Sequence, residues 1–317
     1  GFYVPDNIIR NQYFTDFMDT SDEWIKTRTG IEERRFVDDQ SGPSDLAVKA
    51  SIMALKNANI TPEDIDFIIF ATSTPDYYVP GSGCLLQDKM NFNNIGALDI
   101  RTQCSGFIYG LSIADQYIKS EMYSKILVVG AEVQSTAMDL SSDGRDTCII
   151  FADGAGAAII GESNNGHGIL STHLHSDGSY AKQLWVEAPS SKKLPRLTSK
   201  ILDEKRHFLK MNGSEVFKHA VHRFPEVIEE GLAHNNLQIS DIDLLIPHQA
   251  NLRISKMIQK KLKLDDNQVI TNIQKYGNTT AASIPIALHE AIEKQILKKG
   301  DILVLAAFGS GFSWGSA

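Results

Sequence analysis

The feature that most constrains the fold of this chain is an internal repeat. The segment ALKNANITPEDIDFIIFAT, which starts at Ala54, matches GLAHNNLQISDIDLLIPHQ, which starts at Gly231. Each copy has the pattern of a helix end, a short loop, an acidic DID turn and an apolar strand. Further along, CSGFIYGLSIADQYIK aligns with TTAASIPIALHEAIEK, and KILVVGAEV aligns with DILVLAAFG. Three matches in the same order indicate two copies of one α/β unit.

The repeat predicts a layered α/β fold made of two duplicated halves, residues 1–162 and residues 163–317. Helical and apolar segments alternate within each copy, which is typical of strands covered by helices. The runs FIIFAT and DLLIPH are apolar without alternation, as expected for strands buried on both faces. The polar segment EAPSSKKLPRLTSKILDEKRH lies between the copies and contains prolines, so we interpret it as a surface insertion.

Charge and composition exclude several classes of protein. The net charge of −8 argues against a general nucleic-acid binder, although a local basic surface remains possible. No apolar run approaches the ~20 residues that span a bilayer. The 3 cysteines form no Cys-x-x-Cys pair, so we expect neither a zinc ribbon nor a disulfide scaffold, and a reducing cytoplasm is the expected location. The histidines of HGILSTHLH lack a carboxylate or cysteine cluster, and we interpret them as strand residues and predict no metal site.

Cys104 is the first candidate for chemistry. It stands between the strand-like ALDI and the helical FIYGLSIADQYIK. A cysteine at the start of a helix lies near the positive end of the helix dipole, which favours the thiolate. Free cysteine is also among the most buried residue types. This stretch alone therefore leaves a catalytic and a core interpretation open.

The second copy adds two residues at matching positions. His248 follows a buried strand, and Asn278 precedes the helix that the repeat pairs with the Cys104 helix. Strand ends and helix starts of two related halves can meet at the centre of a fold, and Cys, His and Asn there predict a thiol-based site. The segment FADGAGAAII is not a phosphate-binding loop, because apolar residues flank it on both sides; we predict a hairpin turn there.

Five segments together resemble a known family. They are CSGFIYGLSIADQYIKS, FADGAGAAII, IPHQANLRI, YGNTTAASIPIAL and FGSGFSWGSA, and DTSDEWIKTRTGIEERR precedes them. They are similar to the motifs of β-ketoacyl-acyl carrier protein synthase III, a family of thiolase-fold condensing enzymes, in the expected order from Phe2 to Ala317. The resemblance implies a thiolase-like fold with α-β-α-β-α layers.

The resemblance also implies a reaction and its catalytic residues. Cys104 would take an acyl group from an acyl-coenzyme A primer, and malonyl-acyl carrier protein would then decarboxylate and attack the resulting thioester. His248 and Asn278 would donate hydrogen bonds to the enolate oxygen. The backbone N–H groups of Cys104 and Ser310 would form the oxyanion hole, with Ser310 standing where glycine is commoner. Coenzyme A enters as a substrate, and no further cofactor is implied.

Binding residues follow from the same resemblance. The coenzyme A path would use Thr20, Trp24, Arg28, Arg145, Gly213 and Asn251. The dock for the acidic carrier protein would use Lys218, Arg253, Lys256 and Lys260. Val79 would reach the acyl pocket of a second subunit in a homodimer. A valine there leaves more room than the phenylalanine of acetyl-preferring relatives, so acetyl is the default primer and longer or branched primers are possible.

Three alternatives remain. A relative with the same fold could join other acyl groups in secondary metabolism, and the HQANLR motif and the basic segment after it favour fatty-acid synthesis instead. A thiolase would need a second motif cysteine, which neither Cys84 nor Cys148 supplies. A silent acyl-binding protein would need no Cys-His-Asn set, and an acyl adduct on Cys104 would distinguish it from an enzyme.

Overall fold

The first of two central sheets has the strand order β1-β7-β6-β4-β5. In the computed structural model, which describes residues 1–38, 40–163 and 166–317, its strands are β1 (Phe2–Tyr3), β4 (Phe67–Ala71), β5 (Gly96–Ile100), β6 (Lys125–Glu132) and β7 (Gly154–Gly161). β4 runs parallel to β5 and β6, whereas β7 runs antiparallel to β6 and β1. All five residues of β4 are buried, as its unbroken apolar sequence predicts.

The second sheet repeats this arrangement with the order β11-β12-β13-β8. Its strands are β8 (His173–Ser176), β11 (Leu244–Pro247), β12 (Leu303–Gly309) and β13 (Ser313–Ser316). β11 pairs parallel to β12, and β13 pairs antiparallel to β12 and β8. The strands of the first sheet precede residue 162 and those of the second follow residue 163; the boundary between 1–162 and 163–317 itself stays a prediction.

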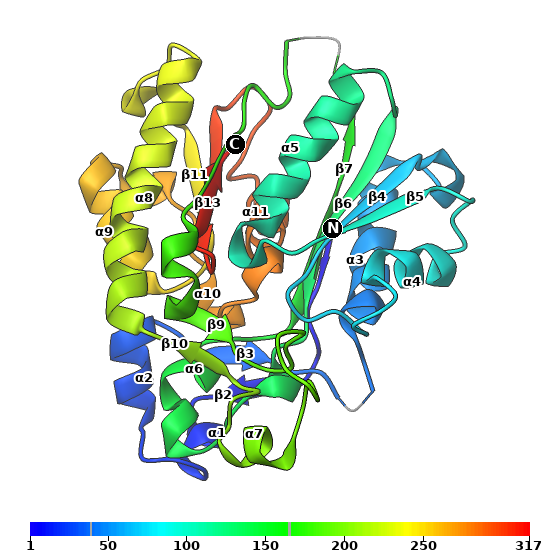
Figure 1. Cartoon of the computed structure of the whole chain (residues 1–317). Coiled ribbons are helices and arrows are strands. Elements are labelled where there is room, and N and C mark those ends of the chain that lie inside the picture. The colour runs from blue at the N-terminus through cyan, green and yellow to red at the C-terminus, as the bar shows by residue number, and fades with distance from the viewer. Residues whose placement is uncertain (39, 164–165) are drawn as a thin grey trace.

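Helices form three layers around the two sheets (Figure 1). α5 (Gly106–Lys119) and α11 (Ser283–Glu293) lie between the sheets, where their apolar side chains share one core with β4, β6, β11 and β12. α3 (Pro43–Ala58) and α4 (Ser82–Lys89) cover the outer face of the first sheet. α8 (Gly213–His234) and α9 (Leu252–Leu262) cover the outer face of the second. The predicted α-β-α-β-α layering is confirmed.

The two halves come into close backbone contact at Gly130. A Cβ atom added at Gly130 in β6 would lie 2.3 Å from the carbonyl oxygen of Ala281, which belongs to the turn before α11. Real Cβ atoms do not come this close to backbone atoms, so only glycine permits the contact. The approach places the start of α11 beside the first sheet, and the candidate site lies at this junction.

Shorter elements cover the end of the sheets near the candidate site (Figure 1). The strands are β2 (Ile8–Arg10), β3 (Glu33–Arg35), β9 (Leu184–Val186) and β10 (Leu209–Met211). The helices are α1 (Gln12–Thr15), α2 (Asp22–Thr29), α6 (Arg145–Cys148), α7 (Ser199–Asp203) and α10 (Ile273–Tyr276). No helix among the described residues is long and apolar enough to cross a membrane.

Two sequence predictions need correction. The DGAG motif forms no hairpin turn: Gly154 begins β7, which pairs with β6 and β1 on its two sides. Of the apolar flanks that suggested a hairpin, Phe151 and Ala152 precede the strand, and Ala157 to Ile160 continue it. The register of the repeat also shifts, because Phe67 pairs with Ile126 and Leu244 pairs with Leu303. Both pairs are separated by the same interval, so Cys104 corresponds to Ala281 and not to Thr279.

Candidate active site

Cys104 lies in a single 3₁₀ turn, Gln103–Ser105, between the end of β5 and the first residue of α5. Gln103 has a φ of 46°, an unusual conformation for a residue with a side chain. Such backbone conformations persist where the surrounding structure holds them, often at functional sites. The turn places the Cys104 side chain at the junction of the two halves, where it is 6% exposed.

His248 comes from the equivalent strand end of the second half. It follows β11, and its N–H donates to the carbonyl of Ala306 in β12 at 2.8 Å. The side chain is 1% exposed, and burial lowers the pKa of His248 to about 3. The imidazole is therefore neutral at physiological pH. Its Nδ1 lies 2.6 Å from the Ser283 hydroxyl, and its Nε2 has no hydrogen-bond partner among the described residues.

Backbone hydrogen bonds to the segment 150–152 hold Asn278 in place. Its N–H donates to Ile150 at 2.9 Å, and its carbonyl accepts from Ala152 at 2.9 Å. Its side-chain Oδ1 accepts from the N–H of Thr280 at 2.9 Å. Because that contact takes the oxygen of the amide, the Nδ2 group is the end left to donate elsewhere.

One cavity of about 510 Å³ brings these three side chains together. Cys104, His248 and Asn278 all line it, and so does Gly309 at the end of β12. Apolar residues of β9, β10 and α8 form much of the remaining wall. A largely apolar cavity with a few convergent polar groups is the usual form of a small-molecule site.

Gly309 was not among the predicted site residues. A Cβ atom there would lie 2.7 Å from the Cβ atom of Cys104 and 3.1 Å from its Sγ. Any side chain would therefore displace the thiol. The signal was present in the segment FGSGF, but only the folded chain shows which of its glycines meets the cysteine.

Ser310 fits its position better than the sequence suggested. The left-handed φ of this turn, 140°, falls on Gly311, so the serine carries no such strain. Its hydroxyl donates to the carbonyl of Leu184, which turns the side chain away from Cys104. The backbone N–H of Ser310 and that of Cys104 both act on the thiol and lower its pKa.

Burial nevertheless dominates the acidity of Cys104. Desolvation and the nearby Glu132 carboxylate together raise the pKa of the Cys104 thiol to about 12. The start of the helix was expected to favour the thiolate, but burial shifts the pKa of Cys104 in the opposite direction. α5 begins only at Gly106, and the loss of hydration outweighs the backbone donors.

A second cavity, of about 680 Å³, reaches Cys104 from another direction. Its wall includes Ser73, Thr74, Arg101, Gln103 and Ser310. The segment 72–74 is fixed by Glu132, which is buried and accepts hydrogen bonds from the Ser73 N–H and from the hydroxyls of Thr72, Ser73 and Thr74. Cys104 thus lines two cavities that a substrate could fill.

The residues predicted for coenzyme A divide into two groups. Trp24, Arg28, Gly213 and Asn251 line the cavity of about 510 Å³, whereas Thr20 and Arg145 lie outside its described lining. The guanidinium of Arg28 lies 4.4 Å from the centre of the Trp24 ring. That of Arg145 lies 4.6 Å from it and donates to the carbonyl of Asp19. At this distance the guanidinium of Arg145 contacts the Trp24 ring directly. A base could stack between the two groups only after the Arg145 side chain moves away.

Asn251 also has a structural role. Its Oδ1 accepts from the Arg253 N–H at 2.9 Å and so caps α9. Its Nδ2 donates to the Arg28 carbonyl at 3.0 Å. The side chain therefore ties the end of α2 to the start of α9, next to the mouth of the cavity.

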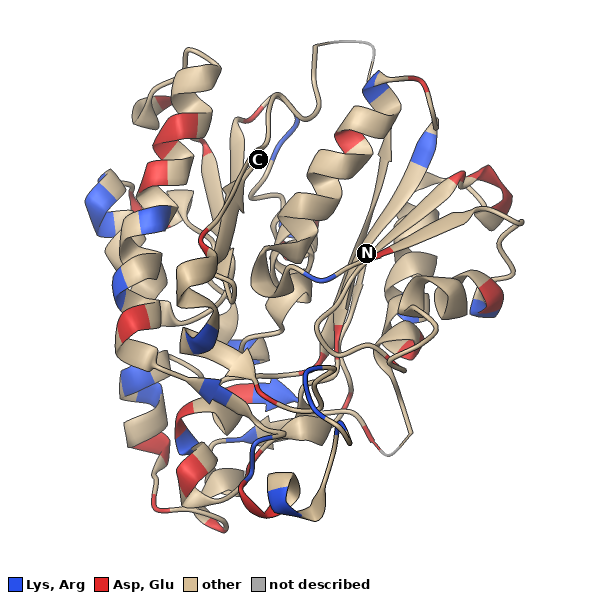
Figure 2. Ribbon diagram, in the orientation of Figure 1, with Lys and Arg blue, Asp and Glu red and all other residues tan. Residues whose placement is uncertain are grey.

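Basic residues gather beside this mouth. Figure 2 shows Lys and Arg along α9 and on α2 on the same side of the molecule. Arg253 lines the cavity, Lys256 pairs with Asp266 at 3.0 Å, and Lys218 on α8 is 74% exposed. Lys260 is exposed in the third turn of α9. The net charge of the chain is negative, but the residues beside the entrance of this cavity form a basic region.

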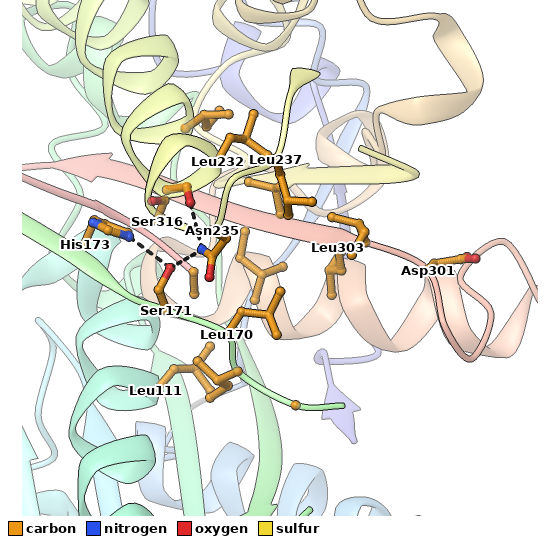
Figure 3. Close-up of a pocket in the computed structure, with 18 of the residues that line it drawn as sticks. Leu111, Leu170, Ser171, His173, Leu232, Asn235, Leu237, Asp301, Leu303 and Ser316 are labelled. Atoms are coloured by element: carbon orange, nitrogen blue, oxygen red, sulfur yellow. Dashed lines mark hydrogen bonds between the residues drawn. The ribbon is translucent and has the colours of Figure 1, made fainter. Parts of the chain in front are cut away.

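The histidines near β8 lie apart from this site. His175 and His173 contact Glu230 at 2.6 and 3.3 Å, and the residues that the structure describes include no group of His, Cys, Asp or Glu placed to hold a metal. His173 lines a separate cavity, of about 230 Å³, and Figure 3 shows the residues around it. Leu232, Leu237 and Leu303 are among its mostly apolar walls, and no predicted catalytic residue lines it.

Comparisons with known proteins agree with this geometry. A family profile described as 3-oxoacyl-[acyl-carrier-protein (ACP)] synthase III matches residues 98–178, and its C-terminal counterpart matches residues 232–317. The chain is 46% identical to the β-ketoacyl-[acyl-carrier-protein] synthase III of Caldanaerobacter subterraneus subsp. tengcongensis, over 100% of this chain and 95% of that protein.

Solved structures show the same relationship. The 3-oxoacyl-[acyl-carrier-protein] synthase III of Aquifex aeolicus VF5 is 41% identical with a TM-score of 0.91, over 100% of this chain and 96% of that one. The priming β-ketosynthase of the R1128 polyketide pathway is 30% identical with a TM-score of 0.91, over 100% of this chain and 92% of that one. This chain therefore belongs to the 3-oxoacyl-[acyl-carrier-protein] synthase III family, the thiolase-fold acyltransferases also called β-ketoacyl-[acyl-carrier-protein] synthase III.

Proposed function

We propose that this chain starts fatty-acid synthesis by condensing an acyl-coenzyme A primer, acetyl by default, with malonyl-acyl carrier protein. The observation that carries the proposal is the position of Cys104 between two cavities, one of which it shares with His248 and Asn278. A nucleophile, a free imidazole donor and a free amide donor around one space suit a thioester that must form and then be attacked by an enolate.

The first half-reaction is acyl transfer to Cys104. The thiol sulfur attacks the primer thioester, the coenzyme A sulfur leaves, and the proton of Cys104 ends on the coenzyme A thiol. Negative charge builds on the thioester oxygen during the attack. The backbone N–H groups of Cys104 and Ser310 are suited to stabilise it, because both act on the thiol and need no reorganisation.

The second half-reaction is decarboxylation and condensation. Malonyl-acyl carrier protein enters the cavity that coenzyme A has left, and loss of carbon dioxide places negative charge on its thioester oxygen. The unpaired Nε2 of His248 and the Nδ2 group of Asn278 are placed to donate to that oxygen. A donor in a site shielded from water stabilises such charge more than water does, by a few kcal/mol. The enolate carbon then attacks the acyl carbonyl on Cys104. The new carbon–carbon bond forms as the bond to the Cys104 sulfur breaks, the 3-oxoacyl product leaves on the carrier protein, and the released thiolate takes a proton from solvent.

The cavity of about 680 Å³ is the proposed space for the acyl chain of the primer. Val79 is 77% exposed, and Tyr77 and Tyr78 beside it are exposed as well. Three large apolar side chains in one exposed loop favour a contact with a second subunit, and we propose the homodimer in which Val79 reaches the partner's acyl space. Sedimentation of the purified protein as a monomer at micromolar concentration would contradict the dimer.

A panel of acyl-coenzyme A primers tests the proposed function. With malonyl-acyl carrier protein as the second substrate, we expect parallel-line ping-pong kinetics and turnover of acetyl-coenzyme A. Primers with four or five carbons should also react, because valine leaves space at position 79. The R1128 relative is a priming enzyme of a polyketide pathway, so turnover with long or unusual primers alone would support the secondary-metabolism alternative. If the enzyme condenses none of these primers with malonyl-acyl carrier protein, the proposal is refuted.

The basic region at the entrance, Lys218, Arg253, Lys256 and Lys260, is the proposed dock for the acidic carrier protein. The ion pair of Lys256 with Asp266 lies at the surface, where such pairs contribute little, so Lys256 remains able to bind a partner. We expect the double variant Arg253→Glu/Lys256→Glu to raise the KM for malonyl-acyl carrier protein by roughly tenfold or more. Acylation of Cys104 by acetyl-coenzyme A should continue.

Lys200→Glu is the matched control, because Lys200 is exposed on α7, away from α9. It should leave the KM for the carrier protein near that of the parent. Unchanged carrier-protein kinetics in the α9 double variant would contradict the dock.

A further inference from the structure

Ser283 is a buried polar residue in direct contact with His248 that has no role in the proposed reaction so far. It is the first residue of α11 and is 2% exposed. Its Oγ lies 2.6 Å from Nδ1 of His248. The repeat explains how they meet: β11 ends at Pro247, and the close approach of the halves at Gly130 places the start of α11 opposite that strand end.

The other contact of Ser283 determines where its proton goes. The backbone N–H of Gln249 donates to Ser283 Oγ at 3.2 Å. A hydroxyl has one proton to donate, and among the described residues the hydrogen bonds of this oxygen are those to Gln249 and His248. The Gln249 N–H can only donate, so if Nδ1 of His248 also donated, the proton of this buried hydroxyl would have no acceptor among the described residues. The hydroxyl proton therefore points to Nδ1 of His248, and Nδ1 accepts.

That assignment fixes the tautomer of the imidazole. A neutral imidazole carries one N–H, so a proton-free Nδ1 leaves the proton on Nε2. Burial keeps the ring neutral by lowering the pKa of His248. Nε2 is the nitrogen without a partner among the described residues, and His248 lines the cavity with Cys104 and Asn278.

We propose that Ser283 is a positioning residue that holds His248 in the tautomer with its proton on Nε2, so that the imidazole donates to the thioester oxygen of the malonyl substrate. The inference rests on the proposed function and assigns the proton that the decarboxylation step needs. It also separates the two half-reactions. An Nε2 that carries a proton cannot accept the proton of Cys104, so acylation of Cys104 does not depend on Ser283.

The test compares both half-reactions in Ser283→Ala. We expect decarboxylation of malonyl-acyl carrier protein to fall roughly 10- to 100-fold, as when a group that orients a catalytic imidazole is lost. Acylation of Cys104 by acetyl-coenzyme A, followed by mass spectrometry, should stay within about twofold of the parent. Ser283→Cys keeps the size of the side chain and a weak donor, and its decarboxylation rate should lie between those of serine and alanine.

Nitrogen-15 NMR of histidine-labelled protein gives a readout that packing alone would not change. The His248 signals, assigned from their loss in His248→Ala, should show a protonated Nε2 in the parent and a mixture of tautomers in Ser283→Ala. Ser51→Ala is the matched control, because Ser51 is a buried serine on α3. It should change neither half-reaction.

Three outcomes would overturn the inference. One is an unchanged decarboxylation rate in Ser283→Ala while His248→Ala lacks that activity. Another is an equal loss of both half-reactions in folded Ser283→Ala and Ser283→Cys, which would indicate a structural role. The third, full decarboxylation by His248→Ala, would instead refute the role of His248 in the proposed function, and the inference with it.

Discussion

Replacing His248 with alanine should slow the decarboxylation of malonyl-acyl carrier protein by at least about 100-fold while Cys104 still accepts an acetyl group. The substitution removes the Nε2 donor, which has no other partner among the described residues, and a single donor of this kind typically contributes 10²–10³ in rate, on the order of 3–4 kcal/mol. Asn278→Ala removes the amide donor that faces the same cavity and should have a similar effect. Release of carbon dioxide measures the loss, and mass spectrometry of the acetylated protein measures the retained step.

His222→Ala is the control for this prediction, because His222 is an exposed histidine of α8. It should keep both steps. The pKa of His248, lowered to about 3, gives a further check: the imidazole stays neutral from pH 8 down to pH 5, so decarboxylation should not fall through protonation of this group in that range. A His248→Ala protein that decarboxylates at the parental rate would remove His248 from the mechanism.

Replacing Cys104 with alanine should have the complementary effect. No acyl-enzyme should form, and condensation should fall by roughly 10⁴-fold or more, the scale of losing a nucleophile that acts with its partners as a unit. Decarboxylation of malonyl-acyl carrier protein should persist, because His248 and Asn278 still face the cavity. The same two assays, carbon dioxide release and mass spectrometry, measure both outcomes.

Cys148→Ala is a close match for this experiment. Cys148 is also buried, and burial also raises the pKa of its thiol to about 12. Its sulfur contacts the sulfur of Met18, and Cys148 does not line the cavity that holds Cys104. Cys148→Ala should therefore acylate and condense like the parent. An acetyl adduct that survives in Cys104→Ala would show that another residue is the nucleophile.

Much of the architecture was predictable because the repeat carries long-range information. Two copies of one helix–strand pattern require two similar sheets, and unbroken apolar strands require helices on both faces. The same logic predicted that Cys104 and His248 stand at ends of strands or starts of helices, and the structure places both there. Local propensity alone would have left them as unrelated buried residues.

The errors have a common physical cause. The register of the repeat near Cys104 was wrong because small residues occur throughout CSG and TTAAS, so composition could not select the alignment. The pairing of β4 with β6 and of β11 with β12 selects it. The DGAG motif contains turn-forming residues, but pairing with β6 on one side and with β1, from the start of the chain, on the other makes its glycines part of a strand.

The chemistry of the site depended most on tertiary contacts. Burial raises the pKa of Cys104. A helix start recognised in the sequence predicts a lowered pKa instead. Gly309 and Ser283 act through their distance to Cys104 and His248, which no motif encodes. The guanidinium of Arg145 lies directly against the Trp24 ring, a contact between segments that are far apart in the sequence.

The central claim is that Cys104 carries the acyl group between the two substrates. Mixing the protein with acetyl-coenzyme A, digesting it and measuring peptide masses tests this claim most directly. We predict one acetyl group on the peptide that contains Cys104, and its disappearance together with formation of the 3-oxoacyl product when malonyl-acyl carrier protein is added. An unmodified Cys104 peptide, or an adduct that malonyl-acyl carrier protein does not discharge, would contradict the account.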